Sequence, residues 1–243
     1  MHQPVIPPEE ELIRLLKFGT SRKIRDLISA NPTMDLHYPL AKNLTTPLTA
    51  AVERSDSAIL TTLIDKIPGN LDATLTQPCG KTALMHAACY ARNSEVLLVL
   101  MKKGADPSKT DINGWNCLFY AVIGKRLQNV IALLDSQVSI ESRDLQGRTP
   151  LMISAVCLSD LDTFHCLLSR GADFEALDNN GLSALHLAIL HKRRECVIEL
   201  WQRNAAADLL TPVSRATTKQ LVEEIMSDVL PVHRKVQDFA EEL

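Results

Sequence analysis

Residues 149–155 read TPLMISA, and related heptapeptides occur at four other places in the chain. They are TPLTAAV from Thr46, TALMHAA from Thr82, NCLFYAV from Asn116 and SALHLAI from Ser183. Their starts are separated by 36, 34, 33 and 34 residues. A nearly constant period in this range is typical of a stacked array in which each repeat is one supersecondary unit.

Two further features recur in the same phase. GAD occurs at Gly104 and Gly171, with NAA in the same slot at Asn204, and D-x-x-G occurs at 111–114, 144–147 and 178–181. Thr or Ser can cap a short helix, proline suits its first position, and glycine ends a helix in the left-handed conformation. Asp followed by Gly three residues later indicates a type I turn. Each unit is therefore predicted as turn, short helix, loop, longer helix and extended return.

These repeats resemble ankyrin repeats, whose T-P-L-H-x-A signature and ~33-residue period match residues from about Lys42 to Ala207. The resemblance implies an all-α solenoid of helix-turn-helix repeats joined by β-hairpin-like loops. The chain departs from the pattern at Asn116-Cys117, at Gln137 in place of the cap glycine, and in extra residues around 67–78. We expect the junction at Gln137 to be irregular.

We expect a single solenoid over residues 1–243. It comprises an N-terminal capping repeat at 8–40, five repeats at about 41–76, 77–110, 111–143, 144–177 and 178–210, and a degenerate C-terminal capping repeat at 211–243. End repeats need a polar outer face, which is the role we assign to the caps. The C-terminal helices could instead dock a partner through Val232, Val236 and Phe239.

Composition narrows the function classes. The net charge of −3 offers no basic field for nucleic acid or a membrane surface, and no apolar run reaches the roughly 20 residues of a membrane span. The N-terminus lacks the pattern of a signal peptide, and the six scattered cysteines fit reduced, mostly buried thiols. We expect a cytoplasmic or nuclear protein, monomeric on its own because both ends are capped.

Several short motifs resemble nucleotide-binding, catalytic or metal sites but do not match them. Gly80-Lys81-Thr82 resembles the end of a P-loop, but Leu75 stands where that motif needs glycine. Cys157, Asp160, His165 and Cys166 are close in sequence, which does not make a triad or a zinc site. His186 fits the histidine slot that the resemblance implies for hydrogen bonds between repeats, and His86 falls one residue late. We predict no enzyme, cofactor, metal or small-molecule substrate.

The candidate site is the concave surface of fingers and inner helices that the resemblance implies. The residue before each capping position gives a ladder of Thr45, Lys81, Trp115, Arg148 and Leu182. Adjoining positions at turn tips and helix ends add Ile112, Leu145, Asn179, Tyr90 and His191. Trp, Tyr and Arg are enriched at binding hot spots, so we expect a protein or peptide to dock here. The alternative is that Trp115 folds back onto Tyr90 or onto its own repeat.

The predicted function is a non-catalytic protein-interaction scaffold or adaptor. Enzymatic activity is disfavoured because the caps and the core account for the chemically interesting residues. A second possibility is that the array is the recognition domain of a larger enzyme or bacterial effector, which targets a separate catalytic domain to its substrate.

Overall fold

The computed structural model describes residues 6–38, 45–66, 69–73, 79–157 and 161–203. These residues form twelve α-helices and no β-strand. The chain divides into two compact units, residues 1–139 (unit 1) and 140–243 (unit 2), which are described in turn. Val232, Val236, Phe239 and the Asn204 slot lie outside the described residues. The expected single array over the whole chain stays a prediction.

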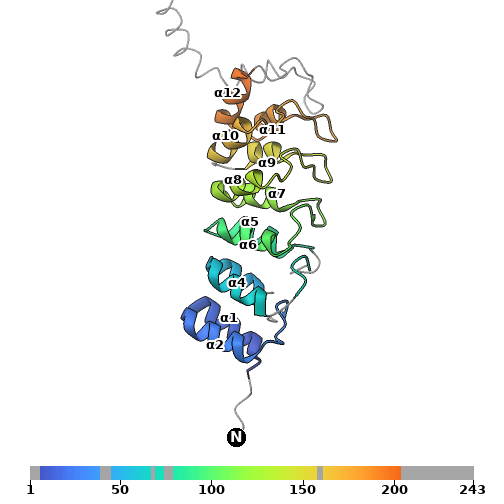
Figure 1. Ribbon diagram of the computed structural model, residues 1–243. Coiled ribbons are helices and arrows are strands. Elements are labelled where there is room, and N and C mark those ends of the chain that lie inside the picture. Colours follow the sequence, from blue (N-terminus) through green and yellow to red (C-terminus); the bar gives the residue numbers. More distant parts are fainter. Residues whose placement is uncertain (1–5, 39–44, 67–68, 74–78, 158–160, 204–243) are drawn as a thin grey trace, which may run out of the picture. The chain divides into compact units, whose positions relative to one another are not determined.

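Unit 1 contains four helix pairs (Figure 1). They are α1 (Pro8–Phe18) with α2 (Ser21–Ala30), α3 (Pro47–Arg54) with α4 (Ser57–Lys66), α5 (Ala83–Tyr90) with α6 (Glu95–Lys102), and α7 (Cys117–Ile123) with α8 (Leu127–Asp135). The first, inner helices pack on one another from α1 through α3 and α5 to α7, and the second, outer helices pack from α2 to α8 in the same way. Leucines of the inner helices, including Leu48, Leu84 and Leu118, are fully buried between them.

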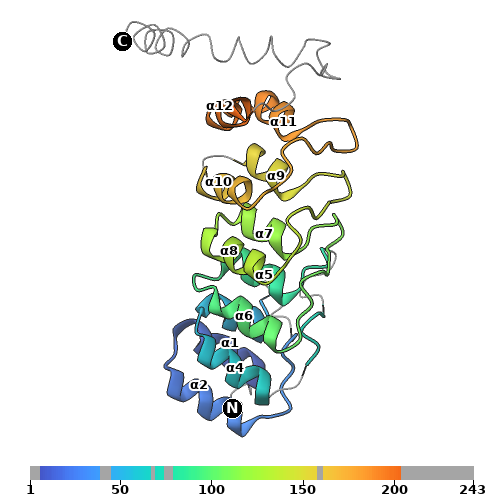
Figure 2. The same ribbon diagram turned by 45° about the horizontal axis from the view of Figure 1, so that its top comes forward.

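Unit 2 repeats the arrangement with two helix pairs (Figure 2). They are α9 (Pro150–Val156) with α10 (Leu161–Ser169), and α11 (Ala184–Leu190) with α12 (Arg194–Gln202). The inner helices α9 and α11 pack together, as do the outer helices α10 and α12. Phe164, Leu167, Leu185 and Val197 are completely buried in this unit.

Each repeated heptapeptide begins a helix as predicted. Thr46, Thr82, Thr149 and Ser183 accept a hydrogen bond from the backbone N–H three residues later, at 3.1, 3.4, 3.3 and 3.5 Å. Asn116 also caps its helix, because its side-chain amide oxygen accepts hydrogen bonds from the backbone N–H groups of Leu118 and Phe119. The departure from the Thr-Pro pattern at Asn116 therefore preserves the cap, because asparagine is also a strong N-cap residue.

Three outer helices, α6, α8 and α10, are followed by a residue in the left-handed conformation. Gly104 and Gly171 have φ of +100° and +84°, and Gln137 occupies the same slot with φ of +63°. The backbone bonds match as well, since Val138 donates to Leu133 as Ala172 does to Leu167. The prediction of an irregular junction at Gln137 is wrong. The helix-ending bonds hold a non-glycine residue in a conformation that glycine adopts more readily.

Buried polar side chains tie neighbouring repeats together within each unit. The Asn129 amide on α8 is buried and donates to the carbonyl oxygens of Ala88 at 3.1 Å and Ala91 at 3.0 Å. Arginines add a second tie: Arg126 Nε donates to the Cys89 carbonyl in unit 1, and Arg193 Nε donates to the Val156 carbonyl in unit 2. These bonds satisfy carbonyl groups that the ends of the inner helices leave without helical partners.

The Asn129 tie gives a stability prediction. Asn129→Ala removes a donor from two buried carbonyls and should lower the free energy of unfolding by about 1–3 kcal/mol. Urea denaturation measures the change, and Gln128→Ala, at the exposed neighbouring position, is the control. Equal unfolding midpoints for the two variants would show that the tie contributes nothing to stability.

Candidate protein-interaction surface

A buried aspartate organises each turn of the D-x-x-G pattern, which we call a finger. In the first finger, residues 111–115, one carboxylate oxygen of Asp111 accepts from the backbone N–H groups of Asn113 and Trp115, both at 2.8 Å. The Asp111 N–H in turn donates to the Trp115 carbonyl at 3.0 Å, and Gly114 donates to the Asp111 carbonyl at 3.1 Å. The last bond confirms the predicted turn, and together the bonds close the finger into a compact loop.

The two fingers of unit 2 repeat this geometry. Asp144 in residues 144–148 accepts from Gln146 and Arg148, both at 2.9 Å. In residues 178–182 the buried Asp178 accepts from the N–H groups two and four residues later at 2.8 and 2.9 Å. Each finger therefore has a tip position directly after the aspartate and a base position four residues after it. Side chains at these two positions meet different surroundings.

The tip side chains are exposed as predicted. Ile112 is 59% exposed and Leu145 is 66% exposed, and Asn179 at the third tip is exposed as well. Large apolar side chains in such a position contact water unless a partner covers them. The tips are also held in place. Asn179 donates from its backbone to Gln146 at 2.9 Å and from its side chain to the Leu145 carbonyl at 3.0 Å. Because a Cβ on Gly147 would collide with Asn179, that close approach requires glycine.

Trp115, at the base of the first finger, is half-buried and packs on its own repeat. Its ring stacks on Phe119 with centroids 5.8 Å apart and meets the edge of Tyr120 at 5.9 Å. Lys81 Nζ lies 4.5 Å from the centroid of the Tyr120 ring, in cation–π contact. The Tyr120 hydroxyl donates to Asp111 at 2.8 Å, and burial together with this bond raises the pKa of Tyr120. Trp115 therefore folds back onto its own repeat, which is the alternative that the sequence analysis left open.

The other two base residues also turn back toward the protein. Arg148 is half-buried and paired with Asp144, its Nη2 and Nε atoms lying 2.7 and 2.8 Å from one carboxylate oxygen. The expectation of an exposed Leu182 is wrong, because its side chain is only 7% exposed. The base of a finger is held close to the following helix by the aspartate bonds, so an apolar side chain there joins the core.

Tyr90 belongs to a cluster that sequence reasoning did not foresee. It ends α5 with 48% of its surface exposed, and its ring centroid lies 4.6 Å from that of His86. His86 Nε2 lies 3.1 Å from Glu53 Oε1 on the neighbouring inner helix. This bond to His86 lowers the pKa of Glu53, against a smaller opposing effect of burial. The two partners are 33 residues apart, one period, and that spacing could have revealed the pair.

The remaining predicted positions have simpler surroundings. His191 is exposed directly after α11. His186 on the same helix is buried beside its own cap, with Nδ1 2.8 Å from the Ser183 hydroxyl, and burial lowers its pKa. His86, which fitted the family slot less well, makes the bond to a neighbouring repeat.

The rejected chemical motifs have structural roles. Thr82 of the Gly-Lys-Thr sequence is a helix cap, and among the described residues no group of His, Cys, Asp or Glu could hold a metal ion. Burial raises the pKa of Cys117 to about 12 and that of Cys196 to about 11. The expectation that most cysteines are buried is wrong, because only these two of the six are buried. Cys79 is exposed, and Cys89, Cys157 and Cys166 are half-buried.

Comparisons with known proteins agree with this architecture. A family model for ankyrin repeats matches residues 12–111 and 103–178. The chain belongs to the ankyrin repeat family. The solved ankyrin repeat domain of Bcl-3 superposes with a TM-score of 0.71 and 24% identity, over 93% of this chain and 100% of that one. This likeness confirms the predicted all-α ankyrin-repeat solenoid. No described helix has the length and apolar character that a membrane crossing requires.

Curated relatives include longer proteins of several kinds. "Putative palmitoyltransferase ZDHHC13" of Danio rerio is 25% identical over 226 residues, which cover 90% of this chain and 33% of that protein. A palmitoyltransferase of Drosophila melanogaster is 25% identical over 252 residues, with 99% and 38% covered. "SH3 and multiple ankyrin repeat domains protein 2" of Homo sapiens is 29% identical over 165 residues, with 68% and 9% covered. The chain therefore spans well under half the length of each of these relatives.

The Glu53–His86 bond gives a pH prediction. The folded-state pKa of Glu53 is lowered, so its contribution to stability is present above the unfolded value near 4.5 and is lost as the pH falls through the folded value. Because Glu53 is partly exposed, that contribution is small. His86→Ala should raise the pKa of Glu53 toward its ordinary value, as measured by NMR titration of the carboxyl carbon. His191→Ala is the control, and an unchanged Glu53 pKa in H86A would contradict the assigned cause.

Proposed function

We propose that this protein is a non-catalytic interaction module that binds a protein or peptide partner through its finger tips and the exposed ends of its inner helices. The supporting observation is the pair of exposed apolar side chains, Ile112 and Leu145, at the same position of successive fingers. Buried aspartates hold both tips in rigid loops, so a partner meets them without a large cost of ordering.

The residues divide into anchors and supports. Ile112, Leu145 and Tyr90 are the apolar anchors because they carry the exposed surface. Trp115, Arg148 and Lys81 are half-buried supports, each of which still contributes part of its surface, and Asn179 and His191 provide polar contacts at the margin. Leu182 is excluded by its burial. Apolar anchors together with polar side chains are typical of protein-binding surfaces.

The finer assignments extend this proposal. We assign an adaptor that works in the cytoplasm or nucleus, where the six thiols stay reduced. Nucleic acid is not the expected partner, because the net charge of −3 opposes binding to phosphate groups.

A second candidate function is recognition on behalf of a catalytic domain in a longer polypeptide. It is favoured by the two palmitoyltransferase-named relatives, which match 90% and 99% of this chain and extend well beyond the matched region. In that arrangement the ankyrin repeats select the protein that the catalytic domain modifies. A transcript that continues the reading frame past Leu243 into a catalytic domain would support this version.

The proposal is tested by removing anchors without touching the supports. Tagged wild-type protein and an Ile112→Ser/Leu145→Ser variant are used to capture partners from host-cell lysate, and the captured proteins are compared by quantitative mass spectrometry. Loss of two anchors should reduce capture of a specific partner about tenfold or more. Tyr90→Ala should weaken capture of the same partner.

Leu98→Ser provides the matched control, because Leu98 is 45% exposed but lies on the outer helix α6. Circular dichroism shows whether each variant folds. Partners that are captured equally by wild type, the tip variant and the Leu98 variant would place the binding surface elsewhere and end the proposal.

A further inference from the structure

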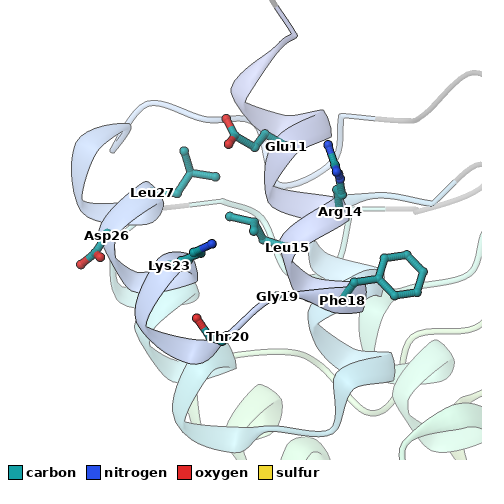
Figure 3. Close-up of a pocket in the computed structure, with 9 residues that line it drawn as sticks. All are labelled: Glu11, Arg14, Leu15, Phe18, Gly19, Thr20, Lys23, Asp26 and Leu27. Atoms are coloured by element: carbon teal, nitrogen blue, oxygen red, sulfur yellow. The ribbon is translucent and has the colours of Figure 1, made fainter.

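A groove opens between α1 and α2, the two helices of the first repeat (Figure 3). Its volume is 690 Å³, and it is lined by Glu11, Arg14, Leu15, Phe18, Gly19, Thr20, Lys23, Asp26 and Leu27. Leu15 and Leu27 are half-buried along it, and Phe18 is 86% exposed. Among the large apolar side chains of the described residues, Phe18 is the most exposed.

The groove lies apart from the packed side of this repeat. α1 packs against α3 and α2 packs against α4, with Leu12, Leu16, Ile24 and Ile28 buried almost completely. Leu15, Phe18 and Leu27 are left out of that core. A fully closed cap would present a polar outer face, and these three side chains make the face partly apolar.

The charges around the groove are balanced. Each helix contributes one acidic and one basic side chain, Glu11 and Arg14 on α1 and Lys23 and Asp26 on α2. All four are exposed, and none forms an ion pair with another residue in the part of the chain that the structure describes. Figure 3 shows Asp26 at one side of the groove and Arg14 at the other.

This distribution is self-complementary. In a twofold-symmetric contact the same surface meets itself, so each position on one side of the axis faces the position on the other side. An axis through the groove therefore brings Arg14 of one copy to Asp26 of the second, and the same pair forms twice. Leu15 and Leu27 of each copy lie between these pairs, and Phe18 lies on the Arg14 side of the groove (Figure 3). A partner rich in charge of one sign would instead meet a like charge on every side of the groove.

We propose that the α1–α2 groove is the contact between two copies of this chain, with Leu15 and Leu27 at its centre and two Arg14–Asp26 pairs at its margin. A monomer is expected from the sequence, and the proposed dimer replaces that expectation. Two short helices per copy make a small interface, so the dimer is weak, with a dissociation constant on the order of micromolar.

The test is a charge exchange in the full chain, measured by analytical ultracentrifugation over a concentration series. Wild type should show a reversible monomer–dimer equilibrium. Arg14→Asp alone and Asp26→Arg alone each turn two attractive contacts into two repulsive ones, and each should raise the dissociation constant about tenfold or more. The double variant R14D/D26R exchanges the pair and should restore dimerisation.

Mixing the two single variants provides an independent arm. In the mixed dimer both contacts join an arginine to an aspartate, so R14D with D26R should associate although each alone is monomeric. Phe18→Ser should weaken every combination. Arg25→Asp is the matched control, because Arg25 is exposed on α2 outside the groove and its reversal changes the net charge equally.

Three results would overturn the proposal. They are a wild-type protein that stays monomeric throughout the series, single reversals that act no more strongly than Arg25→Asp, and a failure of both the double variant and the mixture to restore association. Circular dichroism of each variant separates these outcomes from loss of folding.

Discussion

The fingers of this protein depend on one interaction, in which a buried aspartate at the start of each finger accepts hydrogen bonds from two backbone N–H groups. An unpaired carboxylate would be costly to bury, but Asp111, Asp144 and Asp178 each accept from the residues two and four positions later. The second oxygen of Asp111 is used by Tyr120, and that of Asp144 by Arg148. One side chain thus sets the path of a whole finger and determines which of its side chains reach the solvent.

The parts of this fold that depend on local chemistry were predictable from the sequence. Helix starts at Thr46, Thr149 and Ser183 follow from capping, and the turns ending at Gly147 and Gly181 follow from the D-x-x-G pattern. Even the unusual cap at Asn116 obeys the same rule. Caps and turns are determined by a few neighbouring residues. The repeat period therefore suffices to locate them in the sequence.

Exposure at the base of the fingers was not predictable in the same way. Trp115, Arg148 and Leu182 share one slot, yet Trp115 stacks on Phe119, Arg148 pairs with Asp144, and Leu182 is buried. Their environments depend on the side chains of the helix that follows and on the second oxygen of the aspartate. The exposure of the tip residues Ile112 and Leu145 was easier to predict, because a tip directed away from the helices leaves any side chain in water.

Membership of the ankyrin repeat family explains the framework of helices, but the choice of partner depends on the side chains that this framework exposes. In the part of the chain that the structure describes, the finger tips and the groove at the first repeat both carry exposed apolar side chains, and they suit different partners. The tips are held in loops by their aspartates, which suits a heterologous partner. The groove carries balanced charge around Leu15 and Leu27, which suits a second copy.

The most direct test is amide hydrogen exchange, followed by NMR, in wild type and in Asp144→Ala. Asp173→Ala is the control, because Asp173 is exposed. If the buried aspartate sets the finger, the amides of Gln146 and Arg148 lose most of their protection in D144A, while those of α9 and α11 keep theirs. Unchanged protection of Gln146 and Arg148 in D144A would show that the finger is held by other contacts and would contradict the account.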